Sequence, residues 1–279
     1  MFQYAFGYAL SQEKKDDYCF DLGFYENQPK HVSKRNECLR LFFPGIPFKE
    51  EKRPKKIRFY QNRIINHVLY RHFKRYRKLS NNLFYFKEKR YQFYDLVPHQ
   101  NGALNYYDGY WQSEDYFKLY SDSIKRFFTP SNEILLEVNK WMRIANEDLR
   151  VALHVRRGDL FGNSDKAENQ AMLNYYRKSM HYLRKTVGKF VLFVLSDDLE
   201  WCRLHLDSLN ERIVFVKNEG PFSALIDLFV IANCNHGIMS RSTFSWWGNW
   251  LGMNDNRIVV APSGVYFNER FIPKKWVVI

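Results

Sequence analysis

The stretch Val151–Asp159 reads Val-Ala-Leu-His-Val-Arg-Arg-Gly-Asp, a short apolar run that ends in two arginines, a glycine and an aspartate. A second run, Phe190–Asp198, ends in the same manner in Ser-Asp-Asp. Longer stretches of helical pattern alternate with these runs through the rest of the chain. Such alternation predicts βα units, and hence a parallel sheet covered by helices. Ligands bind at the carboxyl ends of strands in sheets of this kind, so the polar residues that follow each run are candidates for a site.

The pattern predicts the elements of this sheet one by one. The expected strands are Val151–Val155, Phe190–Leu195, Ile213–Val216, Gly237–Met239 and Ile258–Ala261. The expected helices are Asn169–Lys185, Leu199–Leu209, Phe222–Cys234 and Thr243–Leu251. The preceding half is less regular, with a helix expected over Met1–Leu10 and a strand over Tyr18–Leu22. A boundary between Thr129 and Leu149 divides the chain into domains 1–145 and 146–279.

The positive charge is concentrated in one segment. Lys52–Arg90 holds 14 Lys and Arg residues and one acidic residue, which accounts for the whole net charge of +13. Within it, apolar residues of Ile57–Leu79 follow helical spacing, which predicts an amphipathic helix with a basic face. That face suits an anionic membrane surface, a lipid-linked pyrophosphate or a nucleic acid, and a solvated helix face explains it equally well.

Composition excludes several classes of protein. The 279 residues are 46% hydrophobic and 18% aromatic, which favours a folded globular chain. No apolar run is long enough to cross a bilayer, and no secretory leader is recognisable. The four cysteines have neither CxxC nor metal-ligand spacing. We therefore expect a cytoplasmic protein without a metal, either free or peripheral at the inner face of the membrane.

The arginines after the first run suit a diphosphate. Arg156 and Arg157 carry permanent charge and present planar forks of donors, although an ordinary charged turn is the alternative. His154 points the opposite way from Val155, and a lone histidine is more often packed than functional.

Polar residues after two later strands add to the pattern. Asp197 can accept hydrogen bonds from guanine, whereas Asp198 is better explained as a helix N-cap. Ser242 and Thr243 open a helix where a phosphate would lie, and N-capping is again the alternative. The coincidence of arginines, an acidic acceptor and hydroxyls at one edge of a sheet favours a nucleotide site.

Five ordered blocks resemble those of glycosyltransferase family 11, the bacterial α-1,2-fucosyltransferases, within the HxRRxD fucosyltransferase superfamily. His154–Asp159 (HVRRGD) is similar to the HxRRxD motif, and the chain also contains SRSTFSWWGNWL, VLSDDLEWC, GYWQSEDYF and MFQYAFGYAL in the family's manner. The resemblance covers nearly the whole chain. It implies a GT-B-like pair of Rossmann-type domains, inversion without a metal, and GDP-β-L-fucose as donor.

The resemblance also implies roles for the residues. Arg157, supported by Arg156, would hold the diphosphate and stabilise its developing charge; His154 and Asp197 would hold guanosine, and Ser242 and Thr243 would contact phosphate or fucose. Asp159 is the candidate base, with a salt bridge or turn cap as the alternative.

The acceptor is expected on the first domain. Trp111, Gln112 and Glu114 form a polar and aromatic set suited to a galactose-containing glycan, with a structural corner as the alternative. We expect transfer of fucose to the 2-hydroxyl of a galactoside in a surface polysaccharide on a lipid carrier. The rivals are an α-1,6-fucosyltransferase, a non-catalytic GDP-sugar binder and a nucleic-acid-binding module, for which no reader motif is visible.

One departure from the family concerns the N-terminal domain. Family members begin with a strand and a Gly-rich GGLGNQ loop directly before MFQYA, and the printed sequence begins at that methionine. The resemblance therefore implies an N-terminal domain that lacks its expected first strand. Whether such a chain is active, or only binds the donor, is open from the sequence.

Overall fold

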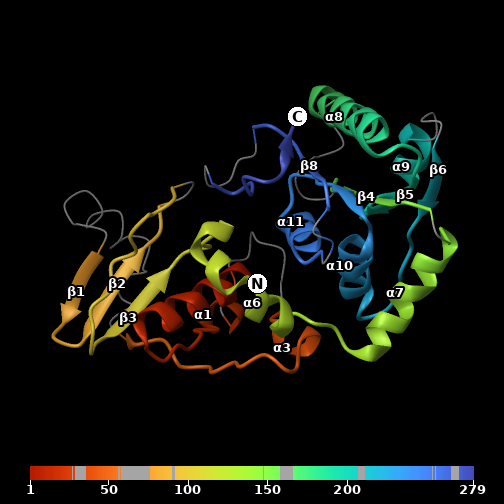
Figure 1. Ribbon diagram of the computed structural model, residues 1–279. Coiled ribbons are helices and arrows are strands. Elements are labelled where there is room, and N and C mark those ends of the chain that lie inside the picture. Colours follow the sequence, from red (N-terminus) through yellow and green to blue (C-terminus); the bar gives the residue numbers. More distant parts are fainter. Residues whose placement is uncertain are drawn as a thin grey trace. The chain divides into compact units, whose positions relative to one another are not determined.

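The computed structural model describes most of the chain. The described residues are 1–26, 28, 36–55, 57, 76–89, 92–146, 148–157, 166–206, 211–252, 254, 256–264 and 270–279. They form two compact units, Met1–Phe127 with Phe267–Pro273 and Phe128–Tyr266 with Lys274–Ile279. Each unit is described by itself below, and Figure 1 labels their elements.

The second unit contains a six-stranded sheet in the order β6-β5-β4-β7-β8-β9, and every neighbouring pair is parallel. Its strands are β4 (Arg150–Val155), β5 (Val191–Ser196), β6 (Arg212–Phe215), β7 (His236–Ile238), β8 (Val259–Ala261) and β9 (Val277–Val278). Its helices are α7 (Asn132–Ile144), α8 (Lys166–Val187), α9 (Leu199–Leu206), α10 (Ser223–Asn233) and α11 (Thr243–Trp250). The predicted parallel sheet flanked by helices is confirmed, and β9 is a strand that the sequence analysis did not predict.

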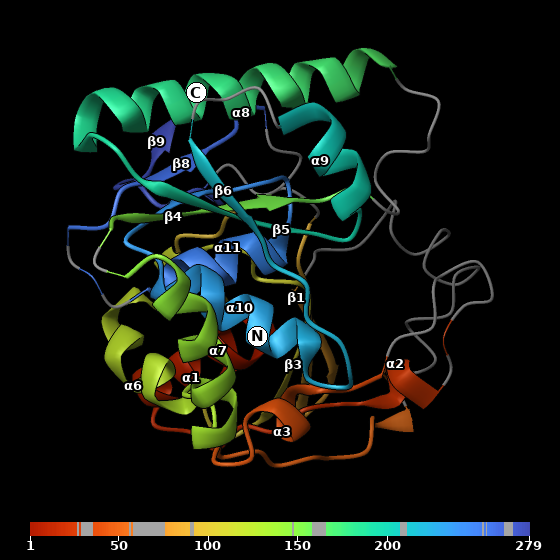
Figure 2. The same cartoon turned by 90° about the vertical axis from the view of Figure 1, so that its right-hand side faces the viewer.

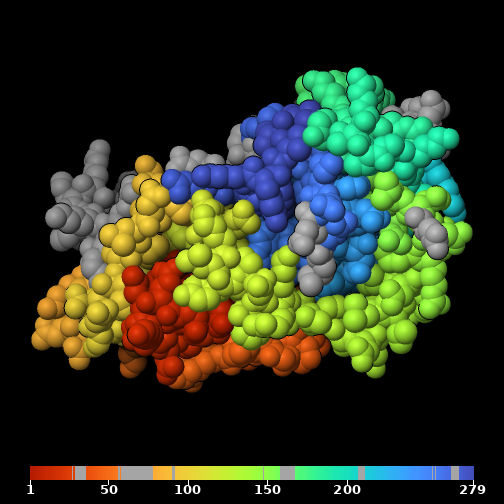
Figure 3. All heavy atoms as spheres, in the orientation of Figure 1, coloured from red at the N-terminus to blue at the C-terminus, as the bar shows by residue number. Residues whose placement is uncertain are grey.

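Helices cover both faces of this sheet. Figure 2 shows α8 along one face, with α10 and α11 on the other. The core between α8, α9 and the sheet contains Leu153 and Leu192 from the strands and Tyr176 and Cys202 from the helices. On the opposite face, the apolar helix α10 packs against α7 and α11. One side of α8 remains on the surface, in the green and teal region of Figure 3.

Two features of sequence fix α11 against α10. Trp246, Trp247 and Trp250 are buried, and the rings of Trp246 and Trp250 stack with their centroids 5.9 Å apart. Gly248 lies directly on α10, since a Cβ at this position would come within 2.9 Å of Ile231. The double tryptophan is therefore a packing feature that anchors the segment before it, residues 240–242.

The first unit contains a smaller, mixed sheet. Strands β1 (Tyr76–Ser80) and β2 (Leu83–Lys87) are antiparallel, and β3 (Leu104–Asp108) is parallel to β2. Its helices are α1 (Phe2–Lys14), α2 (Gly23–Glu26), α3 (Leu39–Phe42), η1 (Glu114–Tyr116), η2 (Lys118–Tyr120) and α6 (Ser121–Phe127). The predicted N-terminal helix is confirmed, whereas the strand expected over Tyr18–Leu22 is reduced to a single bridge between Phe20 and Glu50.

The amphipathic helix expected over Ile57–Leu79 needs correction at its end. Most of it, residues 58–75, lies outside the described residues. Tyr76–Ser80 is the strand β1, because Asn81 and Asn82 form a tight turn that pairs it with β2. The basic segment therefore does not continue as one helix to Leu79.

The boundary between the units falls earlier than the predicted division after Ala145. Helix α7 packs against α10, and its Trp141 Nε1 donates a hydrogen bond to Asn218 Oδ1 (2.8 Å). These contacts place α7 with the parallel sheet.

Candidate functional site

The candidate site lies at the carboxyl edge of the parallel sheet, between β4 and β7. The strand order reverses direction there, which is the position where open α/β sheets form a ligand crevice. His154, the penultimate residue of β4, bridges this point, because its Nδ1 lies 2.8 Å from Ser240 Oγ beyond β7. The two strands are thus joined by polar side chains at the expected edge.

The segment that enters α11 is shaped by its serines. The Ser240 backbone N–H donates to Ser245 Oγ (3.2 Å), and the Ser242 N–H donates to Ser240 O (2.8 Å). Ser242 precedes the helix in extended conformation, yet its side chain makes no capping hydrogen bond. Ser242 and Thr243 are half-buried. The N-cap alternative thus does not explain Ser242.

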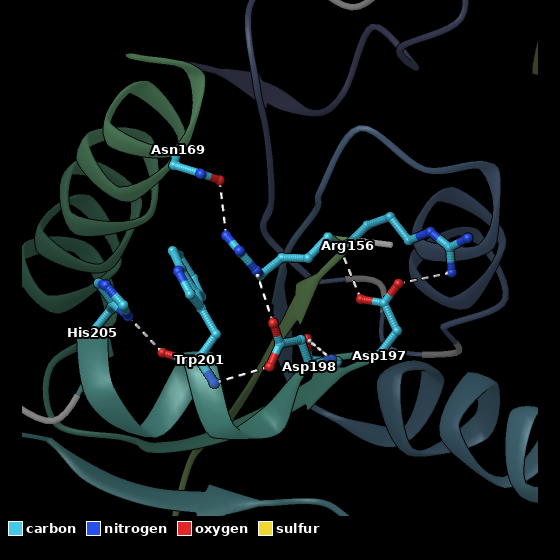
Figure 4. Close-up of polar contacts among 8 residues, drawn as sticks. Arg156, Asn169, Asp197, Asp198, Trp201 and His205 are labelled. Atoms are coloured by element: carbon cyan, nitrogen blue, oxygen red, sulfur yellow. Dashed lines mark hydrogen bonds and ion pairs between the residues drawn. The ribbon is translucent and has the colours of Figure 1, made fainter. Parts of the chain in front are cut away.

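The alternation of the strand separates the two arginines. Strand β4 ends at Val155, which belongs to the α8 and α9 face, as does Arg157, while His154 contacts Ser240 on the other face. Arg156 lies on the side opposite Asn169 and Trp201 (Figure 4). The Arg156 side chain keeps 37% exposure and forms an ion pair with Asp197 (3.1 Å). Arg157 is only 10% exposed. Arg156, to which the sequence resemblance assigns only a supporting role, is therefore the more accessible arginine.

The environment of Arg157 is built by α8 and α9. Its Nη1 donates to Asn169 Oδ1 (2.8 Å), and its Nε donates to Asp198 Oδ2 (3.1 Å). The guanidinium carbon also lies 4.1 Å from the centre of the Trp201 ring. Figure 4 shows Asn169 and Trp201 on the same side of the strand end, with Arg156 on the other.

The two aspartates after β5 make different contacts. Asp198 Oδ1 accepts the Trp201 backbone N–H (3.0 Å), so the predicted N-cap role of Asp198 is confirmed. Asp197 does not cap α9. Its Oδ1 accepts the Arg157 backbone N–H (2.9 Å) while its Oδ2 pairs with Arg156. Asp197 is exposed at this edge and helps to orient Arg156.

Comparison with known proteins identifies the family. Glycosyl transferase family 11 matches residues 44–277. An alpha-1,2-colitosyltransferase of Escherichia coli is 30% identical over 287 residues, which cover 99% of this chain and 93% of that protein. The chain belongs to glycosyl transferase family 11.

Two further likenesses are consistent with membership of family 11. Galactoside alpha-(1,2)-fucosyltransferase 1 of Saimiri sciureus is 32% identical over 107 residues, which cover 38% of this chain and 29% of that protein. The crystal structure of fucosyltransferase NodZ from Bradyrhizobium aligns with a TM-score of 0.51 at 15% identity, over 89% of this chain and 87% of that chain. The likeness confirms the predicted GT-B-like fold.

One candidate residue of this family 11 chain escaped the sequence analysis. Asp227 lies in α10. Its Oδ1 accepts a hydrogen bond (2.6 Å) from Nδ2 of Asn218, which lies in the loop that follows β6. Burial raises the pKa of Asp227 to about 6. A carboxyl with a perturbed pKa in the helix that follows a strand of the sheet is a candidate functional residue. The signal was an isolated aspartate inside the apolar run Leu225–Ala232.

Two buried groups should give opposite pH dependences of stability. Burial lowers the pKa of His154 to about 4. The imidazole therefore binds a proton near pH 6.5 in the unfolded chain but only near pH 4 in the folded protein. His154 therefore contributes stability above pH 6.5 that is lost as the pH falls towards 4, by about 3 kcal/mol in total. Asp227 has the opposite sign, because its raised pKa favours the folded state below pH 4 and loses that contribution as the pH rises through 6.

Urea unfolding between pH 4 and 7 tests this prediction. Relative to wild type, His154→Asn should gain stability as the pH falls, and Asp227→Asn should gain stability as the pH rises. Parallel stability profiles for wild type and either variant would show that its group is not buried as described.

The structure corrects the acceptor role predicted for Trp111 in the first unit. Its ring is 1% exposed and stacks on Phe6 with the centroids 4.1 Å apart, so it offers no open face to a sugar. Glu88 accepts the backbone N–H groups of Tyr110 (2.6 Å) and Trp111 (3.1 Å), which holds Trp111 at a φ of 55°. The structural-corner alternative thus explains Trp111.

The structure describes the other two predicted acceptor residues, Gln112 and Glu114, but not the candidate base Asp159. Gln112 and Glu114 are half-buried, with Glu114 at the start of η1. They remain candidates on the first unit. Asp159 lies outside the described residues.

Proposed function

We propose that this family 11 chain transfers L-fucose from GDP-β-L-fucose, with inversion, to the 2-hydroxyl of a galactoside in a glycan. The observation that carries the proposal is the shared face of His154 and Arg156 beside Ser240 and the start of α11. This face joins an accessible cation to hydroxyl groups at the switch point of the sheet. A sugar diphosphate requires such a combination.

The proposed donor contacts follow from this face. Arg156 contacts the diphosphate, with Ser242 and Thr243 beside the phosphate or fucose. His154 contributes to the guanosine pocket, and Asp197 is the carboxylate at this edge that suits the N1–H and amino group of guanine. Guanine presents these two donors together, whereas adenine does not.

The linkage and the sugar are supported by the named relatives. One is an alpha-1,2-colitosyltransferase and another a galactoside alpha-(1,2)-fucosyltransferase, so both names specify an α-1,2 linkage. Colitose is L-fucose without its 3-hydroxyl, and a site for one accepts the shape of the other. GDP-colitose is therefore the second donor to test.

The transfer step needs charge stabilisation at the leaving group. The acceptor 2-hydroxyl attacks the anomeric carbon from the face opposite GDP, the bond from that carbon to the diphosphate oxygen breaks, and the hydroxyl proton passes to a base. Negative charge develops on the diphosphate, where Arg156 stabilises it more in the transition state than in the ground state. Asp159 remains the proposed base.

We propose that the reaction needs no metal cofactor, because Arg156 supplies positive charge at the diphosphate. Within the described ranges, no group of three or more His, Cys, Asp or Glu side chains could hold a metal ion. Transfer measured in excess EDTA should remain within about twofold of the untreated rate. Loss of transfer in EDTA, restored by added Mg²⁺ or Mn²⁺, would contradict metal independence.

The setting of the reaction is also a proposal. None of the described helices is long and apolar enough to cross a membrane. The basic segment Lys52–Arg90 suits peripheral contact with an anionic inner membrane surface, where a lipid-linked polysaccharide acceptor would be presented. No nucleic-acid partner is proposed.

Calorimetric titration of the whole chain tests the donor. GDP-fucose or GDP-colitose should bind at least tenfold more tightly than GDP-mannose and UDP-galactose. Equal binding of all four nucleotide sugars would contradict the proposal, and donor binding without any transfer would favour a non-catalytic GDP-sugar binder.

A further inference from the structure

Arg157 is held by three side chains from two helices. These are Asn169 at the start of α8, Asp198 before α9 and Trp201 in the first turn of α9, and we call them the Arg157 clamp. Two of the contacts are hydrogen bonds, at 2.8 and 3.1 Å, and the third is a cation–π contact at 4.1 Å. All three attach Arg157 to the α8 and α9 face of the sheet, where Figure 4 shows Asn169 and Trp201.

The clamp is itself supported. Asp198 also caps α9 through the Trp201 N–H, and its own N–H donates to Ser196 Oγ (2.9 Å). The ring of His205 stacks on Trp201 with the centroids 4.4 Å apart, and Figure 4 shows the two side by side. The side chains that hold Arg157 are therefore fixed by other contacts, which reduces the entropy lost when they bind it.

The first turn of α8 is attached at a second point. Glu168, next to Asn169, forms an ion pair with Arg241 (3.0 Å), which lies in the segment between β7 and α11. Adjacent residues of α8 thus contact arginines from the ends of two neighbouring strands. Helix α8 thus contacts the ends of both strands that border the switch point, β4 through Arg157 and β7 through Arg241.

We propose that the Arg157 clamp positions Arg156: by fixing Arg157 on one face of the sheet, it directs Arg156 to the opposite face, where it meets the donor diphosphate. Arg156 lies on the side opposite Asn169 and Trp201 (Figure 4), so anchoring Arg157 to those residues restrains the adjacent Arg156 to the other side. The Arg157 backbone N–H donates a hydrogen bond to Asp197 Oδ1, which fixes the backbone between Arg156 and Arg157. The other carboxylate oxygen of Asp197 forms the ion pair with Arg156. Asn169 and Trp201 are then positioning residues that do not touch the donor.

This inference rests on the proposed function, because it assumes a guanosine diphosphate at the site. It differs from the role expected for Arg157 from the sequence. The sequence resemblance implies that Arg157 contacts the diphosphate itself, with support from Arg156. The two assignments predict different behaviour for nucleotides with and without the second phosphate.

Asn169 gives the sharpest test. Asn169→Leu removes the acceptor for Arg157 Nη1 at similar volume, and Asn169→Asp keeps an acceptor at the same place. Asn174→Leu is the matched control, since Asn174 is an exposed amide on the same helix that accepts a hydrogen bond only from Gln170 among described residues. The affinities of each whole chain for GDP and GMP are measured by calorimetry, and their ratio is the readout.

The ratio isolates the contact with the second phosphate. Wild type should bind GDP about tenfold or more tightly than GMP, the range of one charge-assisted hydrogen bond. Asn169→Leu should lower the ratio about fivefold with little change in GMP affinity, whereas Asn169→Asp and Asn174→Leu should keep it within twofold. A general structural defect would weaken both nucleotides alike.

A double-mutant cycle decides whether the clamp acts through Arg156. Arg156→Met should remove most of the preference for GDP, and adding Asn169→Leu should lower the ratio no further. Additive losses, or a ratio in Asn169→Leu equal to that of wild type, would overturn the positioning role while leaving the donor proposal intact. If wild type binds neither GDP nor GMP, the donor proposal fails, and the positioning role fails with it.

Discussion

Arg156→Met should lower the rate of fucosyl transfer by about 10²- to 10³-fold while the chain remains folded. The loss follows from removing the accessible cation at the carboxyl edge of the sheet, where charge develops on the leaving diphosphate. Arg156→Lys should recover part of the rate, because lysine supplies the charge without the bidentate fork. The measurement is kcat and kcat/KM for GDP-fucose, with thermal unfolding of each variant.

Arg177→Met is the matched control for this prediction. Arg177 is an exposed arginine on the outer side of α8, and its replacement should change kcat/KM by less than twofold. Near-normal turnover in Arg156→Met, together with complete loss in Arg157→Met, would show that the diphosphate contact is Arg157, as the sequence resemblance implies.

Arg257→Met should lower the free energy of unfolding by about 3–5 kcal/mol, without direct effect on donor contacts, because hydrogen bonds from a charged donor contribute about 1.5–3 kcal/mol each. Arg257 donates to the carbonyls of Ile231 (2.8 Å) and Cys234 at the end of α10, and to Asn249 Oδ1 on α11 (2.8 Å). Burial lowers its pKa to about 10, so it stays charged at neutral pH. Methionine fills a similar length but leaves these acceptors without a donor.

Urea denaturation at pH 7.5 measures this effect. Arg257→Lys should lose an intermediate amount, since one ammonium group cannot reach both helices in the same geometry. Arg177→Met again serves as control, with an expected change below about 0.5 kcal/mol. A loss below 1 kcal/mol in Arg257→Met would show that the contacts between α10 and α11 do not depend on this guanidinium.

Much of the parallel sheet was predictable, because its strands are short apolar runs with clear helical stretches between them. The first unit was harder. The hairpin of β1 and β2 follows a basic stretch with helical spacing, and the turn at Asn81 and Asn82 that decides its structure is only two residues long. Strand β9 has two residues, too few to show a period, and it pairs with β8, which lies far from it in sequence.

The site was predictable in its place but not in its assignments. The residues after β4, β5 and β7 do meet at one edge of the sheet. Extending the period of two of β4 past its end at Val155 already separates Arg156 from Arg157 and indicates which arginine is accessible. The contact of Asn169 with Arg157 depends on how α8 packs on the sheet, which local sequence does not specify. Trp111 shows the same limit, because its burial depends on Phe6 at a distance in the chain.

The most direct test of the proposed function is the linkage of the product formed from GDP-fucose and a β-galactoside. The purified whole chain is incubated with both, and the product is examined by methylation analysis and NMR. The account predicts a single fucose in α linkage to the 2-hydroxyl of galactose. Fucose on a different hydroxyl, such as the 6-position, or no product from either GDP-fucose or GDP-colitose, would contradict it.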